Sequence, residues 1–224
     1  MVFGVRLALD RMDIKSQPRN MKGSVDTEPI SQAVESAEGK TSAEFVVVME
    51  PCAGGYRDVD LWAAAAVAFG LLLFAIFSPV VVSVVWLPVL LAGAFLAVQS
   101  IVSRAASVRR WLTSVKRRDE QVQAAAAIQF VRQRVGQTRG RTGVLIYVAR
   151  MEQRVELVAD SGVMRVIEEE AWLVLQKELH ELMNWDKQPD SVAQMVERLG
   201  DHLKDDLPVS DDDVNELGDM PCLH

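Results

Sequence analysis

The sequence predicts an α/β domain that a two-helix transmembrane hairpin interrupts. Three short runs rich in β-branched residues, at 42–51, 142–149 and 154–159, are typical of strands. Segments with apolar residues at helical spacing lie before and after these runs. Between the first and second runs, residues 61–103 contain no Lys, Arg, Asp, Glu or His, in a chain that is 25% charged.

The charge-free stretch divides into two apolar runs, 61–77 and 80–102, separated by Ser78 and Pro79. As helices the runs would be about 25 Å and about 34 Å long, against a hydrocarbon core of about 30 Å. The alternative is a pair of buried helices in a soluble protein. A domain of this size could scarcely enclose two helices that are apolar on every face, so the sequence favours two membrane spans.

The short connection between the runs predicts that both soluble parts lie on the same side of the membrane. Six basic residues follow the second run before the first acidic residue, Asp119, whereas the connection carries none. The excess of Lys and Arg on the cytoplasmic side of membrane proteins then indicates a two-pass protein of the cell's inner membrane, with both termini in the cytoplasm.

The segment 104–120 is expected to form a basic juxtamembrane helix. Val108, Trp111, Leu112 and Val115 fall on one helical face. Such a helix lies along the lipid headgroups or simply extends the second span, and the sequence leaves both alternatives open. The residues expected at the membrane surface are Arg104, Arg109, Arg110, Trp111, Lys116, Arg117 and Arg118.

The two ends of the chain are expected to be disordered. Residues 1–24 form a leader, and residues 209–224 form an acidic tail without the apolar content to fold. From Asp205 onward there are seven acidic residues and no Lys or Arg, which leaves 24 acidic against 24 basic residues elsewhere. A neutral body with an acidic tail lacks the basic face of a nucleic-acid-binding protein.

The first part of the folded domain, 25–60, contains a helix and a strand. Apolar residues at Ile30, Ala33, Val34 and Ala37 predict a short helix over 29–40 that Gly39 ends. The apolar run 42–51 follows as a central strand.

The second part of the domain, 121–208, begins with a helix over 121–135. The strands 142–149 and 154–159 then form an antiparallel hairpin because only a short turn separates them. A helix over 161–183 follows, and one over 189–206 precedes Pro208. The inward-facing residues of these two helices are expected to be Val163, Val166, Ile167 and Leu173 in the first, and Val192, Met195, Val196, Leu199 and Leu203 in the second.

Several of these segments resemble the TPM domain, also called the TPM phosphatase domain. They are VESAEGKTSAEFVVVMEP, the helix AAAIQF, the segment TRGRTGVLIYVARMEQRVELVADSGV, and Trp172 with the closing GDHLKDDLP. The front motif of the family matches Glu38, Thr41 and Glu44, and its central motif matches Thr138, Arg141, Gly143, Asp160 and Gly162. The resemblance implies an α/β/α layered domain with a mixed sheet. The membrane hairpin after the first strand departs from the simplest family pattern.

The resemblance also implies phosphatase activity or binding of a divalent metal, Ca²⁺ or Mg²⁺, at acidic residues near the sheet's end. The candidate metal ligands are Asp58, Asp60 and Asp160, because they follow strands and offer oxygen ligands. Asp160 is equally suited to cap a helix, and Asp58 and Asp60 to mark the membrane edge. No catalytic nucleophile stands out, and His180, His202 and His224 lack ligand-spaced neighbours.

Arg139 and Arg141 precede the second strand and are candidates for binding a phosphate or an acidic partner. In the alternative, Arg141 pairs within the chain with Glu44 or Asp160.

The sequence therefore favours a membrane-anchored, non-catalytic accessory module. It would bind another membrane protein or complex from the cytoplasmic face. The alternative is a divalent-metal-dependent phosphatase of the TPM type. A third hypothesis is a scaffold whose spans associate through the small residues Ala92, Gly93 and Ala94.

Overall fold

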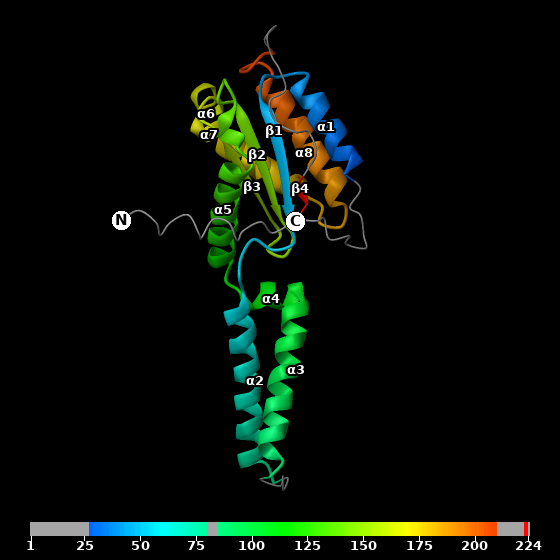
Figure 1. Cartoon of the computed structure of the whole chain (residues 1–224), viewed down its shortest axis with the longest axis vertical. Coiled ribbons are helices and arrows are strands. Elements are labelled where there is room, and N and C mark those ends of the chain that lie inside the picture. The colour runs from blue at the N-terminus through cyan, green and yellow to red at the C-terminus, as the bar shows by residue number, and fades with distance from the viewer. Residues whose placement is uncertain (1–26, 80–84, 210–221, 224) are drawn as a thin grey trace, which may run out of the picture.

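The computed structural model describes residues 27–79, 85–209 and 222–223. Figure 1 shows a folded domain at one end of an elongated molecule and a helical hairpin at the other. The helices and strands are, in chain order, α1 (Glu28–Glu38), β1 (Glu44–Glu50), α2 (Arg57–Phe77), α3 (Leu87–Arg104), α4 (Ala106–Leu112), α5 (Val115–Arg132), the 3₁₀ turn η1 (Val135–Gln137), β2 (Gly143–Ala149), β3 (Arg154–Ala159), α6 (Val163–Val166), α7 (Glu169–Leu182), α8 (Gln188–Leu203) and β4 (Cys222–Leu223).

The sheet is mixed, with strand order β3-β2-β1-β4. β1 and β2 run parallel, with Glu44 opposite Gly143, while β2 and β3 form the expected antiparallel hairpin. β4 pairs in parallel with Val48 and Met49, near the C-terminal end of β1. This pairing was not expected, because residues 209–224 were predicted to be disordered. The expected leader, 1–24, and residues 210–221 of the tail lie outside the described residues.

Side chains of β1 and β2 alternate between two hydrophobic clusters, one on each face of the sheet. On one face, Phe45, Val47 and Met49 pack with the buried residues of α1, α7 and α8. On the other face, Val46 and Val48 pack with α5. All the residues expected to face inward in α1 and α8 are buried. The predicted α/β class and the central position of β1 are therefore confirmed.

The hairpin helices α2 and α3 lie side by side and have both the length and the apolar character needed to cross a membrane (Figure 1). In the most apolar part of each helix, only 17% and 6% of the residues are buried. Core helices of a soluble protein would be mostly buried, and α2 follows a strand of the sheet, unlike an N-terminal signal sequence. Residues 80–84, at the start of the second predicted span, lie outside the described residues.

The expected single helix over 104–120 is wrong. The extended conformation at Ala105 ends α3, so the second span is not extended either. α4 ends at Leu112, and the side chain of Ser114 then accepts a hydrogen bond from the Arg117 N–H at the start of α5. Lys116 and its two basic neighbours therefore belong to the first turn of a helix that continues to Arg132.

The expected continuous helix over 161–183 is also wrong. Extended backbone at Ile167 and Glu168 separates α6 from α7 and shifts the helical phase. As a result Val166 and Leu173, which were expected to face inward, are 44% and 56% exposed. Trp172, Leu175 and Leu179 of α7 are buried instead.

Candidate functional site

The residues singled out by the sequence lie at opposite ends of the sheet. Because β1 and β2 are parallel and β3 runs back, the end of β3 lies beside the start of β1, away from the hairpin. Asp160 therefore lies far from Asp58 and Asp60, which follow the other end of β1. The structure therefore does not bring these three candidate metal ligands together. Among the described residues no three His, Cys, Asp or Glu are placed to hold a metal ion.

At the end of the sheet away from the hairpin, side chains of the front motif form hydrogen bonds to other segments of the domain. A carboxylate oxygen of Glu38 accepts a hydrogen bond from the backbone N–H of Phe45 at 3.0 Å. The hydroxyl of Thr41 donates to the carbonyl oxygen of Leu207 at 2.7 Å and accepts from the N–H of Ala43 at 3.3 Å. These bonds connect α1 to β1 and to the segment after α8.

The central motif forms a tight loop beside the front motif. Arg141 adopts a left-handed backbone conformation, with φ of 56°. Its carbonyl oxygen accepts a hydrogen bond from the N–H of Gly162 at 2.8 Å. A Cβ atom at Gly162 would lie 2.4 Å from the carbonyl oxygens of Gly140 and Arg141, so this approach requires glycine. Thr138 accepts a hydrogen bond from the N–H of Thr142 at 3.0 Å and closes the loop.

Asp160 lies buried beside this loop. One carboxylate oxygen accepts a hydrogen bond from the N–H of Ser161 at 2.6 Å and lies 3.9 Å from Arg141. The other, Oδ2, is buried without a hydrogen-bond partner in the described structure. Arg139 is exposed on the same loop, and the Arg141 side chain is 62% exposed. The structure thus brings Arg139, Arg141 and Asp160 into one region, and the Asp160 side chain does not cap α6, whose N-cap is Gly162.

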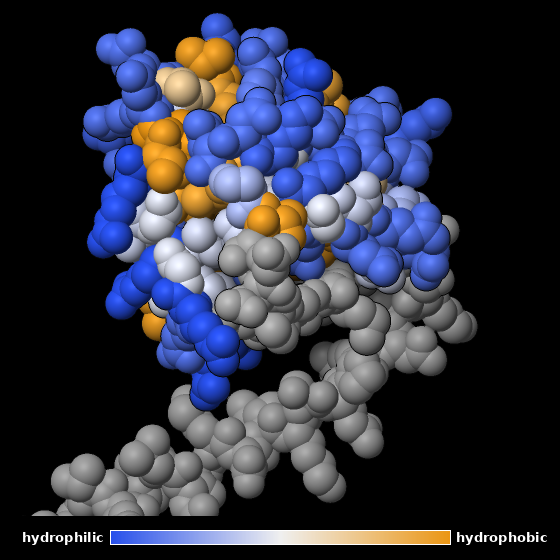
Figure 2. Space-filling view, turned by 90° about the horizontal axis from the view of Figure 1, so that it is seen from above, coloured by the Kyte–Doolittle hydropathy of each residue, from blue (hydrophilic) through white to orange (hydrophobic). Residues whose placement is uncertain are grey.

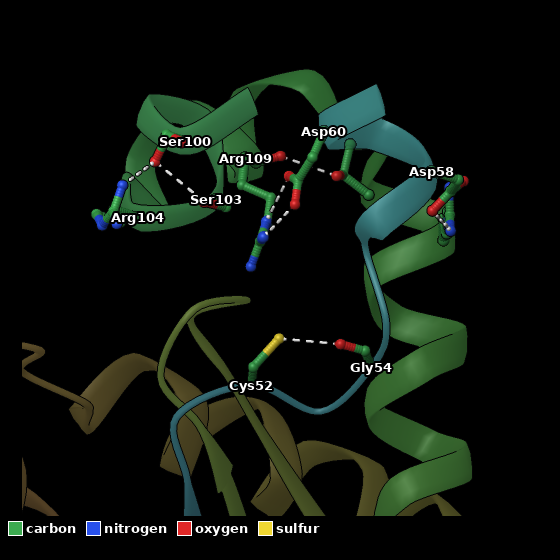
Figure 3. Close-up of polar contacts among 10 residues, drawn as sticks. Cys52, Gly54, Asp58, Asp60, Ser100, Ser103, Arg104 and Arg109 are labelled. Atoms are coloured by element: carbon green, nitrogen blue, oxygen red, sulfur yellow. Dashed lines mark hydrogen bonds and ion pairs between the residues drawn. The ribbon is translucent and has the colours of Figure 1, made fainter. Parts of the chain in front are cut away.

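At the hairpin end, paired charges join α2 to the next two helices. Arg109 of α4 binds Asp60 of α2 with two hydrogen bonds, of which the one from Nε is 2.9 Å long (Figure 3). The Asp60 side chain is 5% exposed and that of Arg109 is 18% exposed. Arg117 of α5 binds Asp58 in the same two-pronged manner, at 2.6 and 2.9 Å. The start of the first span is therefore fixed to the chain that follows the second span.

Glu152, in the β2–β3 turn, is the centre of a buried polar cluster at this end and is fully buried. One carboxylate oxygen accepts hydrogen bonds from the Ala53 N–H and the Tyr56 hydroxyl, both at 2.9 Å, and from the Cys52 thiol at 3.6 Å. The single S–H of Cys52 is shared between this oxygen and the Gly54 carbonyl oxygen, which lies closer, 3.1 Å from the sulfur (Figure 3).

Burial, with Glu152 nearby, raises the pKa of Cys52 to about 11 and also raises the pKa of Tyr56. Both groups therefore remain protonated donors at neutral pH. Sequence reasoning missed Glu152, because a charged residue in a short turn between strands is ordinarily solvated.

The expected membrane-surface residues are only partly available to lipid. Arg109, Arg117 and Arg118 bind acceptors within the protein, the last through a 3.3 Å hydrogen bond to the carbonyl oxygen of Glu152. For these three residues the membrane-surface position stays a prediction, and part of their donor groups is already engaged within the protein. Four of the expected residues keep an exposed or partly exposed position beside the hairpin, namely Arg104, Arg110, Trp111 and Lys116.

No family model matches the chain, and no curated protein matches it. A similar solved structure is the NMR structure of the BA42 protein from the psychrophilic bacterium Bizionia argentinensis sp. nov.. The two superpose with a TM-score of 0.55 over 93% of this chain and 99% of that chain, at 16% sequence identity. At this identity the likeness shows a shared fold.

Proposed function

We propose that this chain is a TPM-domain protein anchored in the cell's inner membrane by its helical hairpin. Its α/β/α layered domain lies on the cytoplasmic face and acts as a non-catalytic accessory module for another membrane protein or complex. The observation that carries this proposal is an exposed apolar hairpin joined to the domain by the paired charges Asp60–Arg109 and Asp58–Arg117.

The exposed surface of the hairpin supports membrane insertion. Phe69, Phe74 and Phe77 of α2 are 61%, 64% and 82% exposed. Exposed apolar surface beyond a few hundred Å² marks a protein or membrane contact in soluble chains. A hydrocarbon environment removes this surface from water, and no charged residue between Leu61 and Ser103 opposes insertion.

Exposed apolar residues outside the hairpin support a protein partner. On α5, Ile128 and Val131 are 65% and 76% exposed, and on α7, Leu173 and Val174 are 56% and 58% exposed. Figure 2 looks onto the end of the domain opposite the hairpin and shows hydrophobic residues exposed among hydrophilic ones. The structural bonds made by Glu38 and Thr41 also favour a fold-holding role for the front motif over a chemical one.

The anchoring is tested by fractionation of cells that express the full chain. We expect the chain to stay in the membrane pellet after alkaline carbonate extraction. A reporter fused after His224 should be active in the cytoplasm, and one inserted at residues 80–84 should be active on the other side. Release of the chain into the supernatant would overturn the proposal, as would a C-terminal reporter outside the cell.

The alternative function is that of a divalent-metal-dependent phosphatase, and it depends on Asp160 as a metal ligand. The buried Oδ2 of Asp160 has no hydrogen-bond partner in the described structure. A single such oxygen falls short of the set of oxygen ligands that Ca²⁺ or Mg²⁺ takes, so the residues here do not fit a metal centre. We expect purified chain to leave a chromogenic phosphomonoester intact with either ion added. Metal-dependent hydrolysis that Asp160→Asn abolishes without lowering Tm would establish the enzyme instead.

A further inference from the structure

A basic cavity of about 700 Å³ lies between the start of α5 and the loops and helices around it. Its wall is formed by α4, the β2–β3 turn, the end of α7 and the segment after α7. The residues that define its chemistry are Arg110, Trp111, Arg118, Arg154, His180 and Trp185. Neither the motifs nor the proposed module role accounts for this site.

The cavity has an excess of positive charge. Three guanidinium groups line it, and its wall includes no Asp or Glu among the described residues. Asp119 offsets one of the three by binding Nε of Arg154 at 2.7 Å. Burial, followed by the influence of Arg154, lowers the pKa of His180. His180 therefore stays neutral near pH 7 and adds a polar ring rather than a charge.

One hydrogen-bond donor of the Arg118 guanidinium has no partner in the described structure. Its NH1 group donates to the Glu152 carbonyl oxygen, whereas its Nε atom is buried without a partner in the described structure. A buried donor of a charged group is costly to leave unpaired. An anion in the cavity would offset the charge of this guanidinium, while Nε itself is closed to solvent. The positive end of the α5 dipole favours negative charge at the same place.

The position of the cavity points to a ligand at the membrane surface. Only Ala105 separates α4 from the second span, so the cavity lies directly beside the end of the hairpin. Trp111 is 84% exposed at its mouth, and Trp185 lines it as well. Tryptophan is enriched at the level of lipid headgroups, where its ring lies between apolar and aqueous surroundings.

We infer that this cavity binds the phosphate group of an anionic phospholipid, with Arg110 and Arg118 as its main donors and the two tryptophans beside the glycerol. The inference rests on the proposed membrane anchoring. Binding of one headgroup would fix the rotation of the domain about the hairpin and orient its exposed apolar residues toward a partner in the same membrane.

The test uses the purified full chain in mild detergent and measures lipid binding by native mass spectrometry. Wild-type chain should retain phosphatidylglycerol in preference to phosphatidylcholine. Arg110→Gln should weaken phosphatidylglycerol binding about tenfold, as expected for loss of a charged hydrogen bond, with phosphatidylcholine binding and Tm unchanged. Arg118→Gln should weaken it at least as much. Arg132→Gln is the matched control, because Arg132 is exposed at the opposite end of α5.

Three results would overturn the inference. One is equal binding of the two lipids, and another is phosphatidylglycerol binding by Arg110→Gln at wild-type strength. The third is binding of inorganic phosphate as tightly as of phosphatidylglycerol, which would assign the cavity to a soluble anion. Carbonate extraction of the same variants separates the two proposals. A chain that stays in the membrane but lacks lipid preference contradicts the cavity inference alone, whereas a chain released from the membrane contradicts the anchoring.

Discussion

Asp60→Ala is expected to destabilise the full chain by about 3 kcal/mol, because it leaves the largely buried guanidinium of Arg109 without its carboxylate. For a chain of this size that loss corresponds to a fall in Tm of roughly 6–12 °C. Thermal unfolding of the detergent-purified chain, followed by circular dichroism, measures the change. The effect should be large because the carboxylate is buried and bound through both oxygens.

Two further variants separate the buried pair from a general charge effect. Asp201→Ala removes an exposed partner of Lys40, 3.1 Å away, and should leave Tm almost unchanged, because exposed ion pairs are screened by solvent. The double variant Asp60→Ala/Arg109→Met should recover part of the lost stability, since apolar replacement of both members of a buried pair is often neutral. If Asp60→Ala is as mild as Asp201→Ala, the joint between hairpin and domain does not depend on this pair.

Local patterns in the sequence were enough to predict α8, β1 and the two helices of the hairpin. In α8 the residues Val192, Met195, Val196 and Leu199 recur at helical spacing, and all are buried against the sheet. The strand β1 was recognisable because it is short, β-branched and too apolar for a surface segment. Such signals lie within a few residues of one another, so they need no knowledge of the tertiary structure.

The arrangement of the site residues depended on strand direction, which no local pattern specifies. The sequence predicted the β2–β3 hairpin but not whether β1 runs parallel to β2. With β1 parallel to β2, Asp160 after β3 lies at the opposite end of the sheet from Asp58. With β1 antiparallel to β2, the same residues would have lain at one end. The three candidate ligands were therefore considered together because the direction of β1 relative to β2 was unknown.

The contacts beside the helical hairpin could not be predicted for a similar reason. Asp60 and Arg109 are 49 positions apart and meet only because the hairpin returns the chain to its starting point. Without knowledge of this tertiary contact, basic residues beside a span are interpreted as lipid contacts. One local signal was available, since Ser114 is a favoured N-cap residue and marks the start of α5. Neither Gly nor Pro lies at the break between α6 and α7, at Ile167 and Glu168, so the sequence holds no local signal of it.

Gly143→Ala is expected to produce a loss of similar size, about 3 kcal/mol, at the other end of the sheet. A Cβ atom there would lie 2.1 Å from the carbonyl oxygen of Val135, a backbone atom that cannot move without disturbing η1. Interiors are packed too closely to absorb such an overlap without shifting the strand. Thermal unfolding of the full chain measures the loss. Gly55→Ala is the matched control, because no atom lies within 4 Å of its added Cβ.

The outcome for Gly143 also bears on whether the central motif holds the fold or does chemistry. Gly143 shares its loop region with Asp160, whose backbone N–H donates to the Gly143 carbonyl oxygen at 2.9 Å. If the motif holds the fold, Gly143→Ala lowers Tm without any ligand present. A chain that keeps its Tm but loses binding of a phosphate-containing ligand would instead place a ligand site at this loop. The proposed module role requires the first result, because it assigns the loop only to the support of the sheet.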